Sequence, residues 1–212
     1  MTFDQMQDSI CSFLQTEQDS RLKAVAGSGI NIAIDEMNVR VWNFMLTTSG
    51  FPFQAGITDY TFTSGVRAPR NFGFTNSDGV QQGRLLYFDP KSFDQQFPDR
   101  SATGIPSAYT VIDNYPNPTV VLNCTPSVDW VAQHPSGLFR YNARIPNLTS
   151  SGQSLDGVPP EAVDAIMWNA RTITALSYDQ HEKVDFAGRK YVAAFRSLRS
   201  QETETQLRDF RV

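Results

Sequence analysis

The sequence predicts an α+β protein in which helices near both ends of the chain enclose a β-rich middle. Near both ends, apolar residues recur every three or four positions, which is the period of one helix face. Between residues 51 and 157 this period is lost, prolines and glycines become frequent, and turn sequences separate short apolar stretches. We therefore expect residues 1–50 and 158–212 to form one helical bundle domain, with residues 51–157 inserted as a β-rich domain.

Two amphipathic helices are predicted at the N-terminal end. Thr2 and Gln5 have the spacing of a capping box, so the first helix is expected to begin there and to end near Gln15. A second apolar stripe runs from Leu22 to about Met45. Gly27 and Gly29 interrupt this stripe, and the sequence leaves open whether the helix continues through them or restarts with Ser28 as its cap.

Turn and cap signals divide the middle of the chain into short elements. Residues 60–63 alternate as a half-buried strand does, and residues 76–79 have the turn chemistry of a hairpin. Asp89 and Pro90 predict the cap and first turn of a short helix that ends near Phe97. Further strands are expected at residues 109–112, 119–125 and 138–143. The insert before the last strand contains Trp130, which is interpreted either as a plug for the sheet or as an exposed contact residue.

The C-terminal part predicts two more helices and a polar tail. Pro159, Pro160 and Glu161 are typical of a helix start, because proline suits the first turn and an acid suits the positive end of the helix dipole. The last apolar stripe runs from Val184 to Leu198, with basic residues mostly outside it. Residues 206–212 combine spaced apolar residues with arginines, which is the composition of a segment that orders on a partner surface.

Composition excludes several classes of protein. The 212 residues are 40% hydrophobic and 19% charged, which argues against wholesale disorder. No window approaches the ~20 apolar residues of a membrane span. The N-terminal sequence lacks the pattern of a signal peptide, so the protein is expected to be made and kept in the cytoplasm. A net charge of −4 does not favour a protein that binds nucleic acid tightly through its phosphates.

Residues suited to catalysis or to cofactors are scarce, and the sequence predicts neither enzymatic activity nor a bound metal or cofactor. The two cysteines, Cys11 and Cys124, are too few and too far apart for a zinc site. His134 and His181 have no spacing to a nucleophile and a carboxylate that indicates a triad. A hydrolase based on Asp156 and Asp164 is a minor alternative.

Three sequence segments support a resemblance to a known family. They are Ile105–Tyr109 with the sequence IPSAY, the Asn117–Pro118 pair, and residues 140–148 with the sequence RYNARIPNL. Together with the order of helix pair, β-region and helix pair, they resemble the head-to-tail adaptor proteins of tailed bacteriophages, including the tail tubular protein A of podoviruses. The insert at residues 127–136 departs from the usual shorter connection in that family.

The resemblance implies a structural virion protein at the head-tail interface. About twelve copies would form a homo-oligomeric ring that joins the portal protein to the next tail component, a nozzle or fibre, and DNA would only pass through its channel. The implied residues of the portal and subunit interface are Arg196, Arg199, Leu207, Arg208, Phe210 and Arg211.

The β-region would face the tail, with Tyr115, Trp130 and Tyr141 as its contact residues. Two other functions stay open. A carbohydrate-binding or fibre-like β-module would need the same three aromatic residues to form an exposed platform. A phage wall hydrolase, the minor alternative with Asp156 and Asp164, would need turnover that is abolished by changing His134 or His181.

Overall fold

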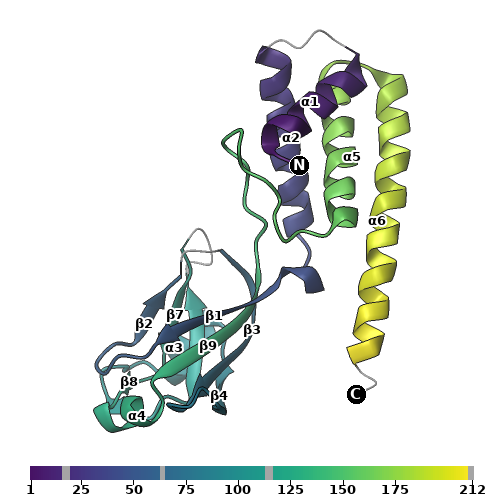
Figure 1. Ribbon diagram of the computed structural model, residues 1–212. Coiled ribbons are helices and arrows are strands. Elements are labelled where there is room, and N and C mark those ends of the chain that lie inside the picture. The colour runs from purple at the N-terminus through teal and green to yellow at the C-terminus, as the bar shows by residue number, and fades with distance from the viewer. Residues whose placement is uncertain (16–19, 63–64, 113–116, 210–212) are drawn as a thin grey trace. The chain divides into compact units, whose positions relative to one another are not determined.

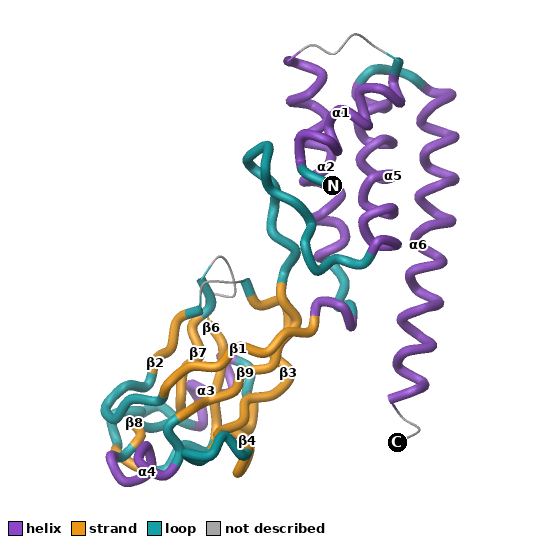
Figure 2. Tube along the Cα trace, viewed as in Figure 1, coloured by secondary structure: helices purple, strands orange, loops and turns teal. Residues whose placement is uncertain are grey.

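The computed structural model has an α+β fold with two compact units, each described here by itself. It describes residues 1–15, 20–62, 65–112 and 117–209, with side chains as far as Gln201. The helical unit consists of residues 1–44 and 145–212, and the β unit of residues 45–144. Figures 1 and 2 show that the β unit is inserted between the second and third long helices of the chain.

Four helices build the helical unit: α1 (Phe3–Leu14), α2 (Ser20–Asn38), α5 (Pro160–Ser177) and α6 (His181–Asp209). Helix α5 packs against both α2 and α6, and α1 crosses α2 and α5 (Figure 1). The predicted capping box is confirmed, since the Gln5 amide donates to Thr2 Oγ1 and the Thr2 amide donates to Gln5 Oε1. The predicted proline start of α5 is also confirmed.

Helix α2 answers one question that the sequence left open and corrects one prediction. The helix continues without a break through Gly27 and Gly29, and both glycines lie where another helix comes close. A Cβ at Gly29 would lie 2.8 Å from Thr174 Oγ1 of α5, and one at Gly27 would meet Gln7 and Phe3 of α1. The helix also ends at Asn38 and not near Met45, since the Trp42 indole donates a hydrogen bond to the Met37 carbonyl.

The segment that follows the β unit packs with the helices, which corrects the predicted boundary at residue 157. Asn38 Nδ2 donates to the Ile145 carbonyl, and the Ile145 amide donates to Asn38 Oδ1, both at 2.9 Å. Asn31 makes the same pair of bonds with Leu148, at 2.9 and 2.8 Å. At the other boundary, the strand that starts at Leu46 belongs to the β unit, so the division falls after Phe44 and not after residue 50.

The β unit is a curled seven-stranded sheet with the order β1-β9-β3-β4-β6-β7-β2. Its strands are β1 (Leu46–Pro52), β2 (Asp59–Thr61), β3 (Val66–Thr75), β4 (Gln81–Tyr87), β6 (Ala108–Ile112), β7 (Thr119–Leu122) and β9 (Ser136–Ala143). A separate small pair joins β5 (Thr103–Gly104) and β8 (Thr125–Pro126). The remaining elements are η1 (Asn43–Met45), α3 (Pro90–Gln96) and α4 (Val128–Gln133).

Several predicted features of the β unit are confirmed. Strands β3 and β4 form the hairpin with its turn at Asn76–Gly79, where Gly79 has a φ of 77°. Asp89 caps α3 with Pro90 in its first turn. The insert contains a helix that the sequence analysis did not predict: Ser127 caps α4 by accepting a hydrogen bond from the Trp130 amide.

An aromatic cluster fills the inside of the curled sheet. Its buried members include Phe53, Phe62, Phe72, Tyr109, Trp130, Phe139 and Tyr141. Phe72 shows the packing, because its ring centroid lies 5.2 Å from that of Tyr109 and 6.0 Å from that of Phe139, both edge to face. Such pairs add to the free energy of burying apolar surface. The β unit therefore has a core of its own.

Two glycines in different helices provide a test of the packing of α2 on α5. Gly29→Ala is expected to lower the free energy of unfolding by about 1–3 kcal/mol, because its Cβ would overlap α5. Gly188→Ala in α6 has open space around the new Cβ and is expected to raise the free energy of unfolding by roughly 0.5–1 kcal/mol. Urea denaturation followed by circular dichroism measures both, and a neutral or stabilising Gly29→Ala would contradict the close packing.

Asn38 provides a test of the boundary between the units. Asn38→Ala removes both hydrogen bonds to Ile145, whose backbone groups stay buried without a partner, so the free energy of unfolding should fall by about 2–3 kcal/mol. Asn147 lies in the same segment, and Asn147→Ala is the matched control. It is expected to change the free energy of unfolding by less than about 0.5 kcal/mol. Equal effects of the two substitutions in a urea titration would show that the segment is not held by Asn38.

Candidate assembly surfaces

The predicted interface residues lie on α6 as far as the structure describes them. Arg196 and Arg199 are both exposed. Leu207 and Arg208 belong to the last turns of α6, and their side chains lie outside the described part, as do Phe210 and Arg211 entirely. The tail expected as a separate segment from Gln206 is thus helical through Asp209, in keeping with a sequence that has no glycine or proline after Gly188.

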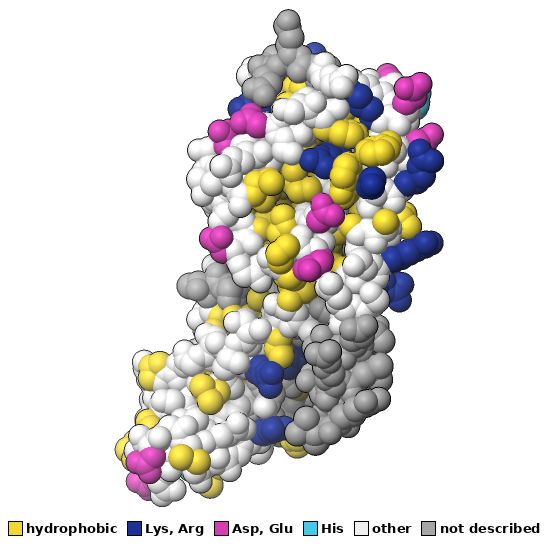
Figure 3. All heavy atoms as spheres, turned by 45° about the vertical axis from the view of Figure 1, so that its right-hand side comes forward, with side chains coloured by type: hydrophobic (Ala, Val, Ile, Leu, Met, Phe, Trp, Pro, Cys, Tyr) yellow, Lys and Arg dark blue, Asp and Glu magenta, His cyan; other side chains and the backbone are white. Residues whose placement is uncertain are grey.

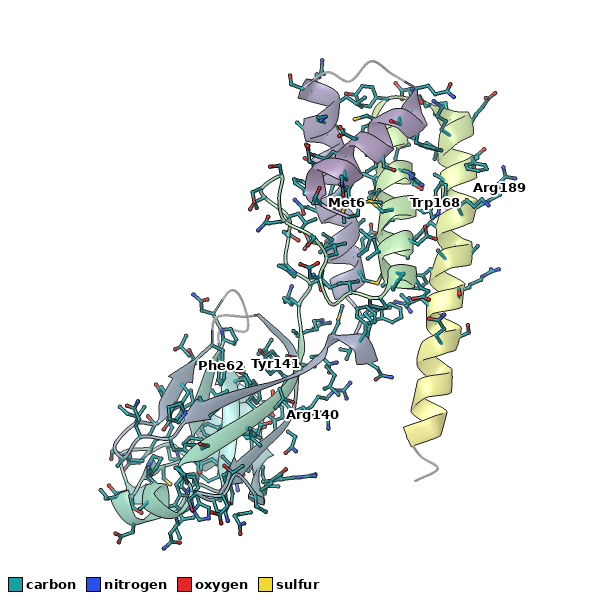
Figure 4. The ribbon with its side chains drawn as sticks, in the orientation of Figure 1. Met6, Phe62, Arg140, Tyr141, Trp168 and Arg189 are labelled. Carbon is teal, nitrogen blue, oxygen red and sulfur yellow. The ribbon has the colours of Figure 1, made fainter. Side chains whose placement is uncertain are left out.

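The exposed face of α6 is basic and partly apolar. Arg189 points away from the bundle in Figure 4 and is exposed, as is Lys190, whose ammonium lies 5.7 Å from the centroid of the Phe186 ring. Phe186 and Val192 are 44% and 45% exposed, which is high for large apolar side chains. Figure 3 shows hydrophobic and basic side chains side by side on this part of the helical unit. Such a mixture is suited to contact with an acidic, partly apolar protein surface.

Helix α2 exposes a second face, which is apolar and acidic. Ile32 is 47% exposed and Val39 is 68% exposed, and Asp35 and Glu36 lie between them. Glu36 accepts a 2.6 Å hydrogen bond from Asn169 of α5, so Glu36 is partly engaged within the unit. Neither Ile32 nor Val39 was predicted from the sequence to be a surface residue. The signal that identifies them is their position on the side of α2 opposite its buried stripe.

A cluster of aromatic and basic side chains joins α1, α5 and α6. The Arg171 guanidinium lies 4.3 Å from the Trp168 ring and 5.5 Å from the Phe13 ring, and its Nη2 donates a 2.9 Å hydrogen bond to Ser9. Phe13 and Trp168 pack edge to face, and Lys183 donates to the Leu14 carbonyl. Burial lowers the pKa of Arg171, and Asp164 opposes that shift. The contacts show that this cluster holds helices together.

The outer face of the sheet is basic. Strands β1, β9, β3 and β4 contain no acidic residue, and their outward positions include Arg84 and Arg140, with Arg70 at a register shift of β3. All three arginines are exposed, and Arg70 Nε donates a 2.5 Å hydrogen bond to buried Asn142. Arg140 is labelled in Figure 4. Arginine forks suit carboxylates, so this face offers a contact for an acidic partner.

Two hollows lie within single units. One, of about 440 Å³, lies between the edge strands β1 and β2, where the rings of Phe51 and Tyr60 approach to 4.7 Å. Burial raises the pKa of Tyr60, and its hydroxyl contacts the carbonyls of Gln54 and Ile57. The other, of about 380 Å³, lies at the start of α5 beside Asp164 and Arg171. Neither hollow contains a histidine or a cysteine.

Two of the three aromatic residues predicted to face the tail are buried and so are not part of an exposed platform. Trp130 is 5% exposed and Tyr141 is 3% exposed, and both belong to the core of the sheet. Tyr115 lies outside the described residues. Of the two interpretations of Trp130, the plug is therefore confirmed. The roles of Trp130 and Tyr141 as contact residues and as a carbohydrate platform are wrong, because both side chains are buried in the core of the β unit.

The histidines and cysteines are not gathered into a site within the described residues. His134 packs with its ring tilted against Trp130 and edge to face with Phe74 at the end of α4, and His181 is exposed at the start of α6. Cys11 and Cys124 lie in different units and form no disulfide. No group of three or more histidine, cysteine or acidic residues suited to a metal ion occurs in the described part of the chain. The helices described there include none that is both long and apolar enough to cross a membrane.

Comparisons with known proteins add no family to these observations. The chain matches no protein-family model, and it matches no curated protein.

Trp130 provides a test of the distinction between core and contact residues. Trp130→Ala is expected to lower the free energy of unfolding by about 3–5 kcal/mol and to weaken the near-ultraviolet circular dichroism of the aromatic cluster. Val128→Ala, in the same helix at 72% exposure, is the control and should stay within about 0.5 kcal/mol of the parent. If Trp130→Ala left stability unchanged, the plug interpretation would be wrong.

Proposed function

We propose that this protein is a head-to-tail adaptor of a tailed bacteriophage, a structural virion protein that forms a ring of about twelve copies. The observation that supports the proposal most is the α+β organisation, in which helices from both ends of the chain form one unit and the β unit is inserted between them. This is the order of elements that the resemblance implies. The ring would join the portal protein to the next tail component and extend the DNA channel.

The exposed surfaces suit a protein that works through repeated contacts. The helical unit presents a basic, partly apolar face on α6 and an acidic, partly apolar face on α2. We assign the α6 side, with Arg196 and Arg199, to contacts with the portal and with neighbouring copies. The basic outer face of the sheet, with Arg84 and Arg140, then remains for an acidic surface of the next tail component, a nozzle or fibre.

The charge distribution suits a channel through which DNA slides. The β unit contains seven basic and seven acidic residues, so the net charge of −4 resides in the helical unit. About twelve copies multiply that charge around the ring, and a negative wall does not retain the phosphate backbone. DNA would therefore be a passing molecule and not a bound ligand, and the proposed function needs neither a cofactor nor a catalytic group.

Disrupting the gene for this protein in the phage genome tests the proposed function. A stop codon early in the reading frame is expected to give heads that package DNA but carry no tails, and electron microscopy of the lysate would show both products separately. Supplying the intact chain from a plasmid should restore tailed, infectious particles. Tailed particles in normal number without this protein would overturn the proposal, including the case in which such particles attach but fail to penetrate the cell wall.

A further inference from the structure

We infer that α2 of one copy packs in parallel alongside α6 of the next copy, with Arg21 opposite Glu182 and Asp35 opposite Arg196. This inference rests on the proposed ring and specifies which two surfaces would build it. It is argued from the helical unit alone, whose helices pack directly on one another.

The face offered by α2 is a single stripe along the whole helix. The exposed positions Arg21, Ala24, Ser28, Ile32 and Asp35 recur at intervals of three or four residues, so they share one side, and exposed Val39 follows directly after the helix end. That side lies opposite the stripe that contacts α1 and α5. The small residues Ala24 and Ser28 allow another helix to come close, and Ile32 supplies an exposed apolar side chain.

The face offered by α6 is a matching stripe with the opposite order of charge. Glu182, Asp185, Arg189, Val192, Ala193 and Arg196 are all exposed and share the side of α6 away from the buried Ala187. The acids come first along α6 and the arginines follow. On α2 the arginine comes first and the acid follows.

The spacing of these charges defines one register. Arg21 and Asp35 are fourteen residues apart on α2, and Glu182 and Arg196 are fourteen residues apart on α6. Fourteen residues span about 21 Å in both helices, so a parallel arrangement brings both oppositely charged pairs together at once. The same register places Ile32 beside Ala193. An antiparallel arrangement would bring Arg21 next to Arg196, where like charges repel.

The charges on α2 are also placed against the dipole of their own helix. Arg21 lies in the first turn of α2, where the helix end is positive, and Asp35 lies in the last turn, where it is negative. Glu182, by contrast, lies in the favourable first turn of α6. A neighbouring α6 in this register would place an acid near Arg21 and an arginine near Asp35, which compensates both positions.

The directions of the helices agree with cyclic symmetry. Figure 1 shows that α2 and α6 both begin at the same end of the helical unit and run the same way, on either side of α5. If the rotation axis of a ring runs parallel to these helices, α2 of one copy therefore faces α6 of the next copy in the same direction and at the same height along the axis. Because the two faces differ, the contact repeats from copy to copy, and without a shift along the axis it closes into a ring.

Disulfide trapping with the full-length chain tests this register. A chain with Ile32→Cys is mixed with a chain with Ala193→Cys under mild oxidation, and the rate of formation of the mixed dimer is measured on non-reducing gels. The matched control uses Ala24→Cys with Ala193→Cys, because both positions of the control lie on the same two stripes. The parallel register predicts that the first pair is trapped at least about tenfold faster, since a disulfide needs Cα atoms within about 7 Å.

Exchanging the charges of one proposed pair tests whether the trapping rate depends on that pair, because trapping by random collision would not respond to the exchange. Asp35→Arg in the Ile32→Cys chain should slow trapping, and Arg196→Asp in the Ala193→Cys chain should restore it. The unmodified chain reports any dimer formed through Cys11 or Cys124. Equal rates for the two cysteine pairs, a faster Ala24 pair, or dimers of the Ile32→Cys chain with itself at the same rate would overturn the inference.

These results are separate from the outcome of the gene disruption. If heads without tails accumulate but the two pairs are trapped equally, the adaptor function stands and other surfaces build the ring. If the Ile32 pair is trapped selectively but tails attach without the protein, the α2–α6 contact stands and the adaptor function fails.

Discussion

The helical unit depends on two asparagines that hold the chain as it returns from the sheet. Asn31 and Asn38 are two helical turns apart, which is about 10.5 Å along α2. Ile145 and Leu148 are three residues apart, and an extended chain covers about 10 Å over that interval. Each amide side chain therefore meets one backbone position of the returning segment, and both its donor and its acceptor are used. This match of two periods fixes residues 145–148 against α2.

Each of the two units has a core of its own. The β unit is filled by its own aromatic cluster, centred on Phe72 and closed by Trp130. The helical unit is filled by aliphatic side chains such as Ile10, Ile30 and Ile166, with the Phe13–Trp168–Arg171 cluster beside them. Polar backbone groups at the connection are paired within the helical unit, so the burial of its helices does not require the β unit for those bonds.

Local chemistry explains what the sequence predicted correctly. The capping box at Thr2, the Asp89–Pro90 start and the Asn76–Gly79 turn each depend on residues within four positions of each other, and all three are present. The errors come from distant contacts. The domain boundary at Ile145 depends on an asparagine 107 positions away, and the inward direction of Tyr141 depends on the pairing of β9 with both β1 and β3. No pattern within a window of a few residues contains that information.

The candidate surfaces were predictable only in part for the same reason. Arg196 and Arg199 are recognisable in the sequence as basic residues outside an apolar stripe. Ile32 and Asp35 are recognisable as surface residues only when the fold shows that the other side of α2 packs on α5. Each of these faces exposes few apolar side chains, so in the proposed ring a single contact between copies would bury little apolar surface and would depend strongly on salt. A closed ring would use both faces of every copy, so the contacts would reinforce one another once closure is possible. On this proposal the copies would stay dispersed when dilute and would assemble where a partner gathers them.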